Sequence, residues 1–276
     1  MAIGAAILFW YFRAAPQHKS AAAESLTRAT EQAVFLLRRD DSAAQSDAVS
    51  ALRAIEKEHP GSIEAKAGLV LAQALIYDDL LQYSSRLRKA ISKADRQSGA
   101  ETEGAAEPLS LQISTLKTKL EASEKRVFEQ ARILQADRDR LDEMATVQSM
   151  SMDAELAMLR ARAMALAIEG DPQALLLADR FRARSQQDDN WADLTMPEYV
   201  ANGGQLHDEA MAQLREIQSR AGNSTFLRPY VLAARINLLR GNTEDAIAAL
   251  DQVVTMNDKH LVARELLDWT RSLRAQ

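Results

Sequence analysis

Residues 228–254 read RPYVLAARINLLRGNTEDAIAALDQVV, and this stretch decides the fold of the 276-residue chain. It holds two apolar helical runs separated by a Gly-Asn pair at 241–242, a pair that ends helices. In the second run, Ala246, Leu250 and Val253 follow the i, i+4, i+7 spacing of one helical face. The stretch therefore predicts a helical hairpin whose second helix presents a small residue, then two larger ones, to a neighbour.

The same helical face recurs twice upstream at a fixed interval. Its alanines at 174, 210 and 246 lie 36 residues apart (210 − 174 and 246 − 210). A period of 20 to 50 residues indicates stacked supersecondary units, because one helical pair cannot bury both of its apolar faces. We therefore expect stacked helical pairs in the carboxy-terminal half. The three faces consist of Ala174, Ala178 and Phe181; Ala210, Leu214 and Ile217; and Ala246, Leu250 and Val253.

The amino-terminal half carries parts of the same pattern. Ala48, Leu52 and Ile55 reproduce the i, i+4, i+7 spacing, and Pro60 follows where that helix has to close. A small Ala-Gly pair at 67–68 comes next, where another helix can approach closely. The pattern therefore extends the expectation of helical pairs to the amino-terminal half.

On these residues the chain resembles the tetratricopeptide repeat family, in a degenerate form. Tyr230 takes the family's aromatic position, whereas Asn237 replaces its usual tyrosine and Asp258 its closing proline. The unit that ends at Ala201 has a short first helix interrupted by Pro197. The resemblance covers about two-thirds of the chain. It implies a helical-hairpin solenoid with a concave groove that accepts extended or helical peptides.

Composition agrees with a helical protein. Gly and Pro number only 10 and 6 and aromatic residues make up 5%, which favours close-packed helices over sheets. We expect an all-α fold: a tetratricopeptide-like helical-hairpin solenoid with a long coiled-coil-like helical arm. The expected segments are a partial membrane anchor and juxtamembrane segment at 1–19, repeat-like helices at 20–97, a linker at 98–107, the arm at 108–152, and repeats with a capping helix at 153–276.

Helix-breaking residues set the expected boundaries within these segments. Asp-Asp-Ser at 40–42 and His-Pro-Gly at 59–61 divide the first segment into two expected helical pairs. No Gly or Pro occurs between Pro108 and Gly170, and one straight helix of that length would reach ~93 Å. We therefore expect at least one break in this stretch.

Apolar residues of the arm keep a 4-3 heptad spacing, which Ser123, Gln130 and Asp137 interrupt. The stripe either packs on the neighbouring helical pair or joins copies of the chain into a homo-oligomer. The sequence leaves both alternatives open. The stripe comprises Leu109, Ile113, Leu116, Leu120, Val127, Leu134, Leu141 and Met144.

The amino terminus is the only strongly apolar segment. Residues 2–12 (AIGAAILFWYF) are uncharged and end in an aromatic cluster before Arg13. Since a membrane span needs ~20 apolar residues, the run suits the last part of a single-pass anchor. A signal-peptide remnant and an amphiphilic end packed on protein are the alternatives, but the aromatic cluster fits an interfacial belt. Arg13 and Lys19 favour a cytoplasmic body, whereas resemblance to single-pass repeat proteins of the bacterial envelope favours a periplasmic one.

No catalytic or metal-binding motif stands out. The four histidines at 18, 59, 207 and 260 are isolated from one another, and the chain has no cysteine. Lys and Arg total 34 against 39 acidic residues, without a basic block that could neutralise phosphates. We therefore expect no enzyme, no cofactor, no metal site and no nucleic-acid partner.

A binding role is the remaining prediction. The resemblance places Arg228 and Arg235 on the groove side of the last repeat and Arg264 on the capping helix, which hints at an acidic peptide. Arginines four to seven residues apart also occur simply as a solvated helix face. The leading hypothesis is a membrane-tethered, non-catalytic adaptor that holds a partner peptide or subunit in its groove. The alternative is a structural oligomer assembled through the arm.

Overall fold

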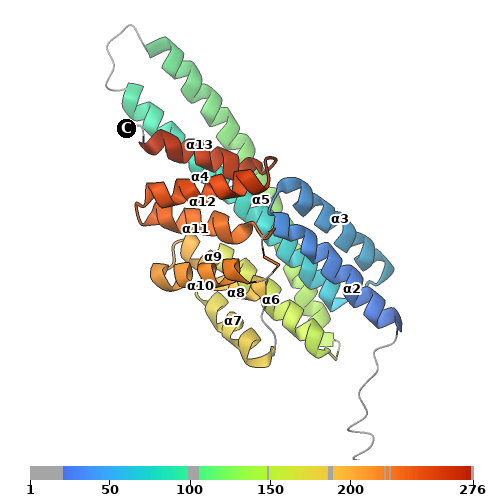
Figure 1. Ribbon diagram of the computed structural model, residues 1–276. Coiled ribbons are helices and arrows are strands. Elements are labelled where there is room, and N and C mark those ends of the chain that lie inside the picture. The colour runs from blue at the N-terminus through green and yellow to red at the C-terminus, as the bar shows by residue number, and fades with distance from the viewer. Residues whose placement is uncertain are drawn as a thin grey trace, which may run out of the picture.

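The computed structural model describes residues 21–98, 106–147, 149–185, 189–220, 222–223 and 225–274. Within these ranges the chain is helical and has no strand, so the predicted all-α class is confirmed (Figure 1). None of the helices in these ranges combines the length and the apolarity that a membrane crossing requires. The predicted anchor at 1–19 and the stripe residue Leu109, whose side chain is not described, lie outside this description.

The amino-terminal part consists of α2 (Ala21–Leu36), the short η1 (Leu37–Arg39), α3 (Ser42–Glu58) and α4 (Ile63–Ser98). Asp41 starts α3 by accepting a hydrogen bond from the Ala44 amide at 2.8 Å. Both predicted breaks are thus confirmed. The prediction of two helical pairs is wrong.

Residues 63–98 form one helix because they contain no proline and only one glycine, Gly68. That glycine serves close packing instead of a turn. A Cβ on Gly68 would lie 2.8 Å from Leu52 Cδ2 and 3.2 Å from Val34 Cγ2, so α4 approaches α3 and α2 closely here.

The helix α5 (Ala106–Val147) runs back along α4 as its antiparallel partner (Figure 1). The buried stripe residues include Ile113, Leu134, Leu141 and Met144. Each of the three polar residues that interrupt the stripe pairs with a polar residue of α4. Ser123 Oγ lies 2.6 Å from Ser84 Oγ, Gln130 donates to Gln73 Oε1 at 2.6 Å, and Lys66 donates to Asp137 at 3.1 Å. Packing of the arm within its own chain is the alternative that this structure favours.

The break predicted between Pro108 and Gly170 is confirmed, because α5 ends at Val147 and α6 (Met152–Ile168) begins after Ser151. The Ser151 hydroxyl caps α6 by accepting a hydrogen bond from the Ala154 amide. The helices that follow are α7 (Gln173–Arg184), α8 (Asn190–Asp193), α9 (Thr195–Ala201), α10 (His207–Ser219), α11 (Arg228–Leu239), α12 (Thr243–Met256) and α13 (Leu261–Arg274). Pro197 lies in the first turn of α9, so the expected short, interrupted first helix is present as α8 and α9.

The period-36 residues form the interior of this carboxy-terminal stack. Ala174, Ala210 and Ala246 are each 0% exposed, and the other six residues of the three faces are at most 4% exposed. Each second helix (α7, α10, α12) packs on the first helix of its own pair and on the next one along the chain. The predicted burial of these faces is therefore confirmed.

The long helix α4 passes along the first helices of the stack. It packs on α6, and Gln82 donates to Asn202 after α9 at 3.2 Å. Farther along, Arg86 pairs with Glu265 of α13 at 3.2 Å and Lys89 lies over the Trp269 ring at 5.3 Å. The stack therefore does not present an empty inner face along this line, because the chain's own α4 covers it.

Candidate functional site

Arg228 and Arg235, the predicted groove residues of α11, are buried instead. Their exposed fractions are 1% and 7%. Both guanidinium groups pair with Asp78 of α4 and Glu198 of α9, and Arg235 also donates to Asn202 at 2.8 Å. The expectation that they line an open groove is wrong, since α4 supplies the acidic partner that a peptide was expected to bring.

These residues belong to a buried ionic cluster that joins distant parts of the chain. Arg228 donates to Glu198 at 3.0 and 2.9 Å, and its other terminal nitrogen lies 3.4 Å from Asp40 and 3.5 Å from Asp79. The members come from the end of η1, from α4, α9 and α11. With every member ionised, four carboxylates and two guanidiniums leave a formal charge of −2. The cluster comprises Asp40, Asp78, Asp79, Glu198, Arg228 and Arg235.

The carboxyl groups of the cluster titrate differently because their surroundings differ. Burial would raise the pKa of Asp78, but Arg235 and Arg228 lower it below its ordinary value. Burial and the neighbouring Asp40 raise the pKa of Asp79 to about 7, against an ordinary value of 3.8. Burial also raises the pKa of Glu198. The four carboxylates in turn raise the pKa of Arg228 despite its burial, so that this cation stays charged.

His260 borders the cluster as the capping residue of α13. Its Nδ1 accepts from the Ala263 amide at 3.2 Å, and its Nε2 lies 3.7 Å from Asp40. Of the other histidines, His59 is exposed and His207 begins α10, so both lie apart from the cluster, and His18 lies outside the described ranges. Among the residues that the structure describes, no group of three His, Cys, Asp or Glu side chains is arranged to hold a metal ion.

Arg264, the third predicted groove residue, is exposed on α13 and donates to the Asp258 carbonyl. It therefore stands apart from the buried pair Arg228 and Arg235. Sequence reasoning grouped three arginines that the fold separates into an interior pair and a surface residue.

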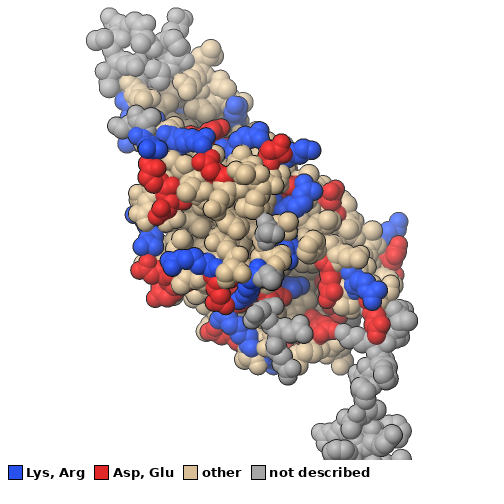
Figure 2. Space-filling model, viewed as in Figure 1, with Lys and Arg blue, Asp and Glu red and all other residues tan. Residues whose placement is uncertain are grey.

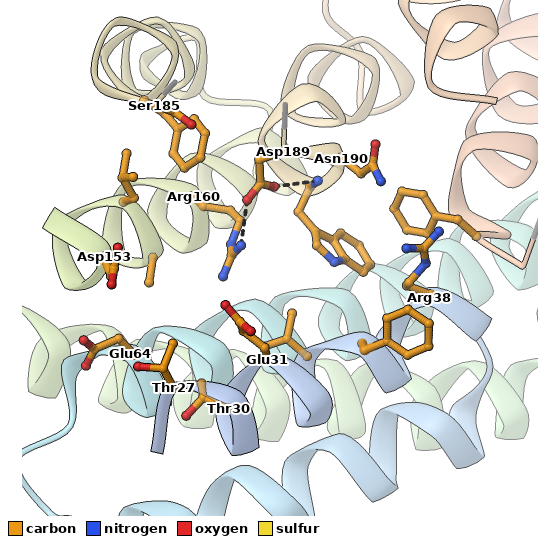
Figure 3. Close-up of a pocket in the computed structure, with 17 residues that line it drawn as sticks. Thr27, Thr30, Glu31, Arg38, Glu64, Asp153, Arg160, Ser185, Asp189 and Asn190 are labelled. Carbon is orange, nitrogen blue, oxygen red and sulfur yellow. Dashed lines mark hydrogen bonds and ion pairs between the residues drawn. The ribbon is translucent and has the colours of Figure 1, made fainter. Parts of the chain in front are cut away.

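An open cavity lies elsewhere, between the amino-terminal helices and the first pairs of the stack (Figure 3). We call it the α2–α6 groove; its volume is about 540 Å³, within the ~300–1,000 Å³ of ligand sites. One wall is a single face of α2 continued by Arg38, and the opposite wall is a face of α6. The lining residues are Thr27, Thr30, Glu31, Val34, Phe35, Arg38, Glu64, Asp153, Leu156, Ala157, Arg160, Phe181, Ser185, Asp189, Asn190, Trp191 and Phe226.

Aromatic side chains gather at one end of this groove. Trp191 and Phe226 meet edge to face with ring centroids 4.8 Å apart, and Arg38 lies over Phe226 at 5.2 Å and over Phe35 at 5.0 Å. Arg38 is held in place by hydrogen bonds to the Gly222 carbonyl at 2.6 Å and to Asn223 at 2.7 Å. Phe35 is 57% exposed, so this end of the groove has an exposed apolar surface.

Charged side chains occupy the middle and the other end. Arg160 pairs with Asp189 at 2.7 Å, and Asp189 also caps α8 through the Trp191 and Ala192 amides. Glu31 points toward Arg160 across the groove, while Glu64 and Asp153 lie together at the far end (Figure 3). The sequence did not reveal this site, because its residues come from five separated segments.

Elsewhere on the visible face, basic and acidic side chains are interspersed (Figure 2). Comparisons with protein-family models, with curated proteins and with solved structures find no match to this chain.

Proposed function

We propose that this chain is a non-catalytic adaptor of the tetratricopeptide type, tethered to a membrane by its amino-terminal segment. The observation that carries the proposal is the α2–α6 groove, a cavity of about 540 Å³ with an exposed phenylalanine on its rim. Helix faces with apolar and charged side chains form its walls, which suits a protein segment as ligand.

The binding surface in this proposal differs from the one expected by resemblance. The concave line along the first helices is covered by α4, and Arg228 and Arg235 are already paired with Asp78. The groove between α2 and α6 remains open to a partner. The predicted binding of a partner peptide or subunit therefore moves to this surface, and the arginine pair becomes part of the scaffold.

The tether is proposed from the sequence, and its side of the membrane from the resemblance, against the positive charges of Arg13 and Lys19. The uncharged run at residues 2–12 supports an anchor, and the resemblance to single-pass repeat proteins of the bacterial envelope favours a periplasmic body. The alternative function, a homo-oligomer joined by α5, would have to use apolar residues that packing on α4 leaves exposed or half-buried. The exposed large apolar residues of α5 that could take that role are Leu111, Phe128, Ile133 and Val147, at 71%, 66%, 39% and 85% exposure.

In-cell photo-crosslinking tests the proposal. A benzoylphenylalanine in place of Phe35 should give one discrete adduct in intact membranes, whereas the same residue in place of Leu239, 54% exposed on α11, should give none. Equal labelling from both positions, or none from position 35, would contradict the groove as the binding surface.

A further inference from the structure

Unpartnered polar atoms gather in the α2–α6 groove. Among the residues that the structure describes, seven buried side-chain N or O atoms lack a hydrogen-bond partner, and three of them belong to groove residues: Thr30 Oγ1, Arg38 Nε and Arg160 Nε. Thr30 is itself only 6% exposed. Buried polar groups are normally hydrogen-bonded, so the lining of this groove is less fully satisfied than most of the described interior.

The two ends of the groove differ in the charge of their side chains. Its aromatic end holds Arg38, which donates to the Gly222 carbonyl and to Asn223 and lies over the Phe35 and Phe226 rings. Toward the other end lie Glu31, Glu64 and Asp153 (Figure 3). Arg160 belongs to its pair with Asp189. The charged side chains of the lining are four carboxylates and two guanidinium groups, so the groove carries a formal charge of −2 when all of them are ionised.

Local helix structure accounts for part of this acidity. Glu64 and Asp153 stand in the first turns of α4 and α6, where acidic residues stabilise a helix. Glu31 has no such role, since it lies in the middle of α2 on the face that lines the groove. It is an exposed carboxylate beside the apolar Val34 and Phe35, and it faces the cavity. Glu31 is therefore the groove carboxylate that stabilisation of a helix terminus does not explain, which makes it the candidate for contact with a ligand.

We propose that the α2–α6 groove binds a partner protein through a segment with a cationic side chain next to apolar or aromatic side chains. The cation lies at Glu31, Glu64 and Asp153, and the apolar side chains lie against Phe35 and the aromatic end. Charge complementarity fixes the orientation of the segment, and apolar contact supplies most of its affinity. This inference rests on the proposed adaptor function and names the chemistry of its partner.

The span of the lining sets the length of the segment. On the α2 side the groove runs from Thr27 to Arg38, 11 residues apart (38 − 27), or ~16 Å at the helical rise. Two fluorescein-labelled peptides of twelve residues are suitable probes. Both carry Leu, Phe and Trp at the same positions, and the other positions are all Lys in one and all Glu in the other.

Fluorescence anisotropy with the full chain in a mild non-ionic detergent measures the binding. The Lys peptide should bind at least tenfold more tightly than the Glu peptide. Glu31→Lys should abolish most of that preference, whereas Glu209→Lys, an equal charge change at an exposed position of α10, should preserve it. Phe35→Ala should weaken both peptides.

The outcomes separate the two proposals. If neither peptide binds, or if Phe35→Ala changes nothing, the groove is not the binding surface and both proposals fail. If Phe35→Ala weakens binding but Glu31→Lys behaves like Glu209→Lys, the adaptor function stands and the cationic partner is overturned. A third probe is the peptide of residues 1–20, which carries Arg13 and Lys19 beside its apolar run. Glu31-dependent binding of that peptide in preference to the Lys peptide would identify the chain's own segment as the occupant and overturn a separate partner.

Discussion

Replacing Arg228 by methionine should destabilise the protein strongly, because it removes a buried cation without removing much side-chain volume. Arg228 is 1% exposed and donates to Glu198 at 3.0 and 2.9 Å, while Asp78, Asp40 and Asp79 surround it. Its loss takes the formal charge of the ionised cluster from −2 to −3. Removal of one partner from a buried ion pair costs ~3–5 kcal/mol, and we expect a loss in that range.

Thermal unfolding followed by circular dichroism at neutral pH measures the effect. For a domain of this size 1 kcal/mol corresponds to ~2–4 °C, so the Tm of Arg228→Met should fall by roughly 6–20 °C. Arg271→Met is the matched control, since Arg271 pairs with Asp251 at 2.8 Å but both side chains are about half exposed. Exposed pairs contribute ~0–1 kcal/mol, so the control should melt close to the wild type.

An equal Tm for the two variants would refute this reasoning. It would mean that the four carboxylates need no buried cation besides Arg235, and that Arg228 does not join η1, α4, α9 and α11. A large loss for Arg228→Met with an unchanged control would identify the cluster as the joint between the two halves of the chain.

Three further predictions concern the interior. The pKa of Asp79 is about 7 in the folded chain against 3.8, so the folded state binds a proton more tightly than the unfolded state, and the contribution of Asp79 to stability should fall as the pH rises from about 4 to 7. In urea titrations the stability of Asp79→Asn relative to the wild type should therefore increase by on the order of 2–4 kcal/mol from pH 5 to pH 8. A difference that stays constant with pH would contradict the raised pKa. Ala246→Leu should cost ~1–3 kcal/mol by overpacking a 0% exposed site, whereas Ala248→Leu on the exposed side of α12 should melt like the wild type; equal melting of both would place α12 in a different register. Gln130→Leu should cost ~1–3 kcal/mol in the same assay, since it leaves the buried Gln73 side chain unpaired, and an unchanged Tm would mean that water or another group satisfies Gln73.

The parts of the fold that could be predicted from the sequence, buried helix faces and helix ends, depend on local residue spacing. The alanine rows at 174, 210 and 246 mark buried helix faces because the i, i+4, i+7 rule depends only on neighbours within one helix. Breaks at 40–42 and 59–61 were predictable for the same reason, since they depend on local turn chemistry. The single helix at 63–98 was missed because the repeat pattern favoured two helical pairs, although no residue of this stretch ends the helix. The close approach expected at Ala67-Gly68 is confirmed, since Gly68 packs against Leu52.

The cluster and the groove depend on contacts between residues far apart in the chain. Arg228 meets Asp78 across 150 positions, and helical spacing cannot show such a pairing. One signal was present: Asp78 and Asp79 interrupt an otherwise apolar stretch of α4, where unpaired carboxylates would be costly. Likewise, the heptad interruptions at Ser123, Gln130 and Asp137 recur every seven residues, a pattern that matched polar partners on a neighbouring helix explain.

Hydroxyl-radical footprinting of the complex purified from membranes, compared with the isolated chain, tests the central claim most directly. The two reporters are Phe35 at the rim of the groove, 57% exposed, and Phe128 on α5, 66% exposed. A partner seated in the α2–α6 groove should reduce oxidation of Phe35 several-fold and leave that of Phe128 unchanged. Protection of Phe128 with undiminished oxidation of Phe35 would contradict the adaptor account and favour assembly through α5.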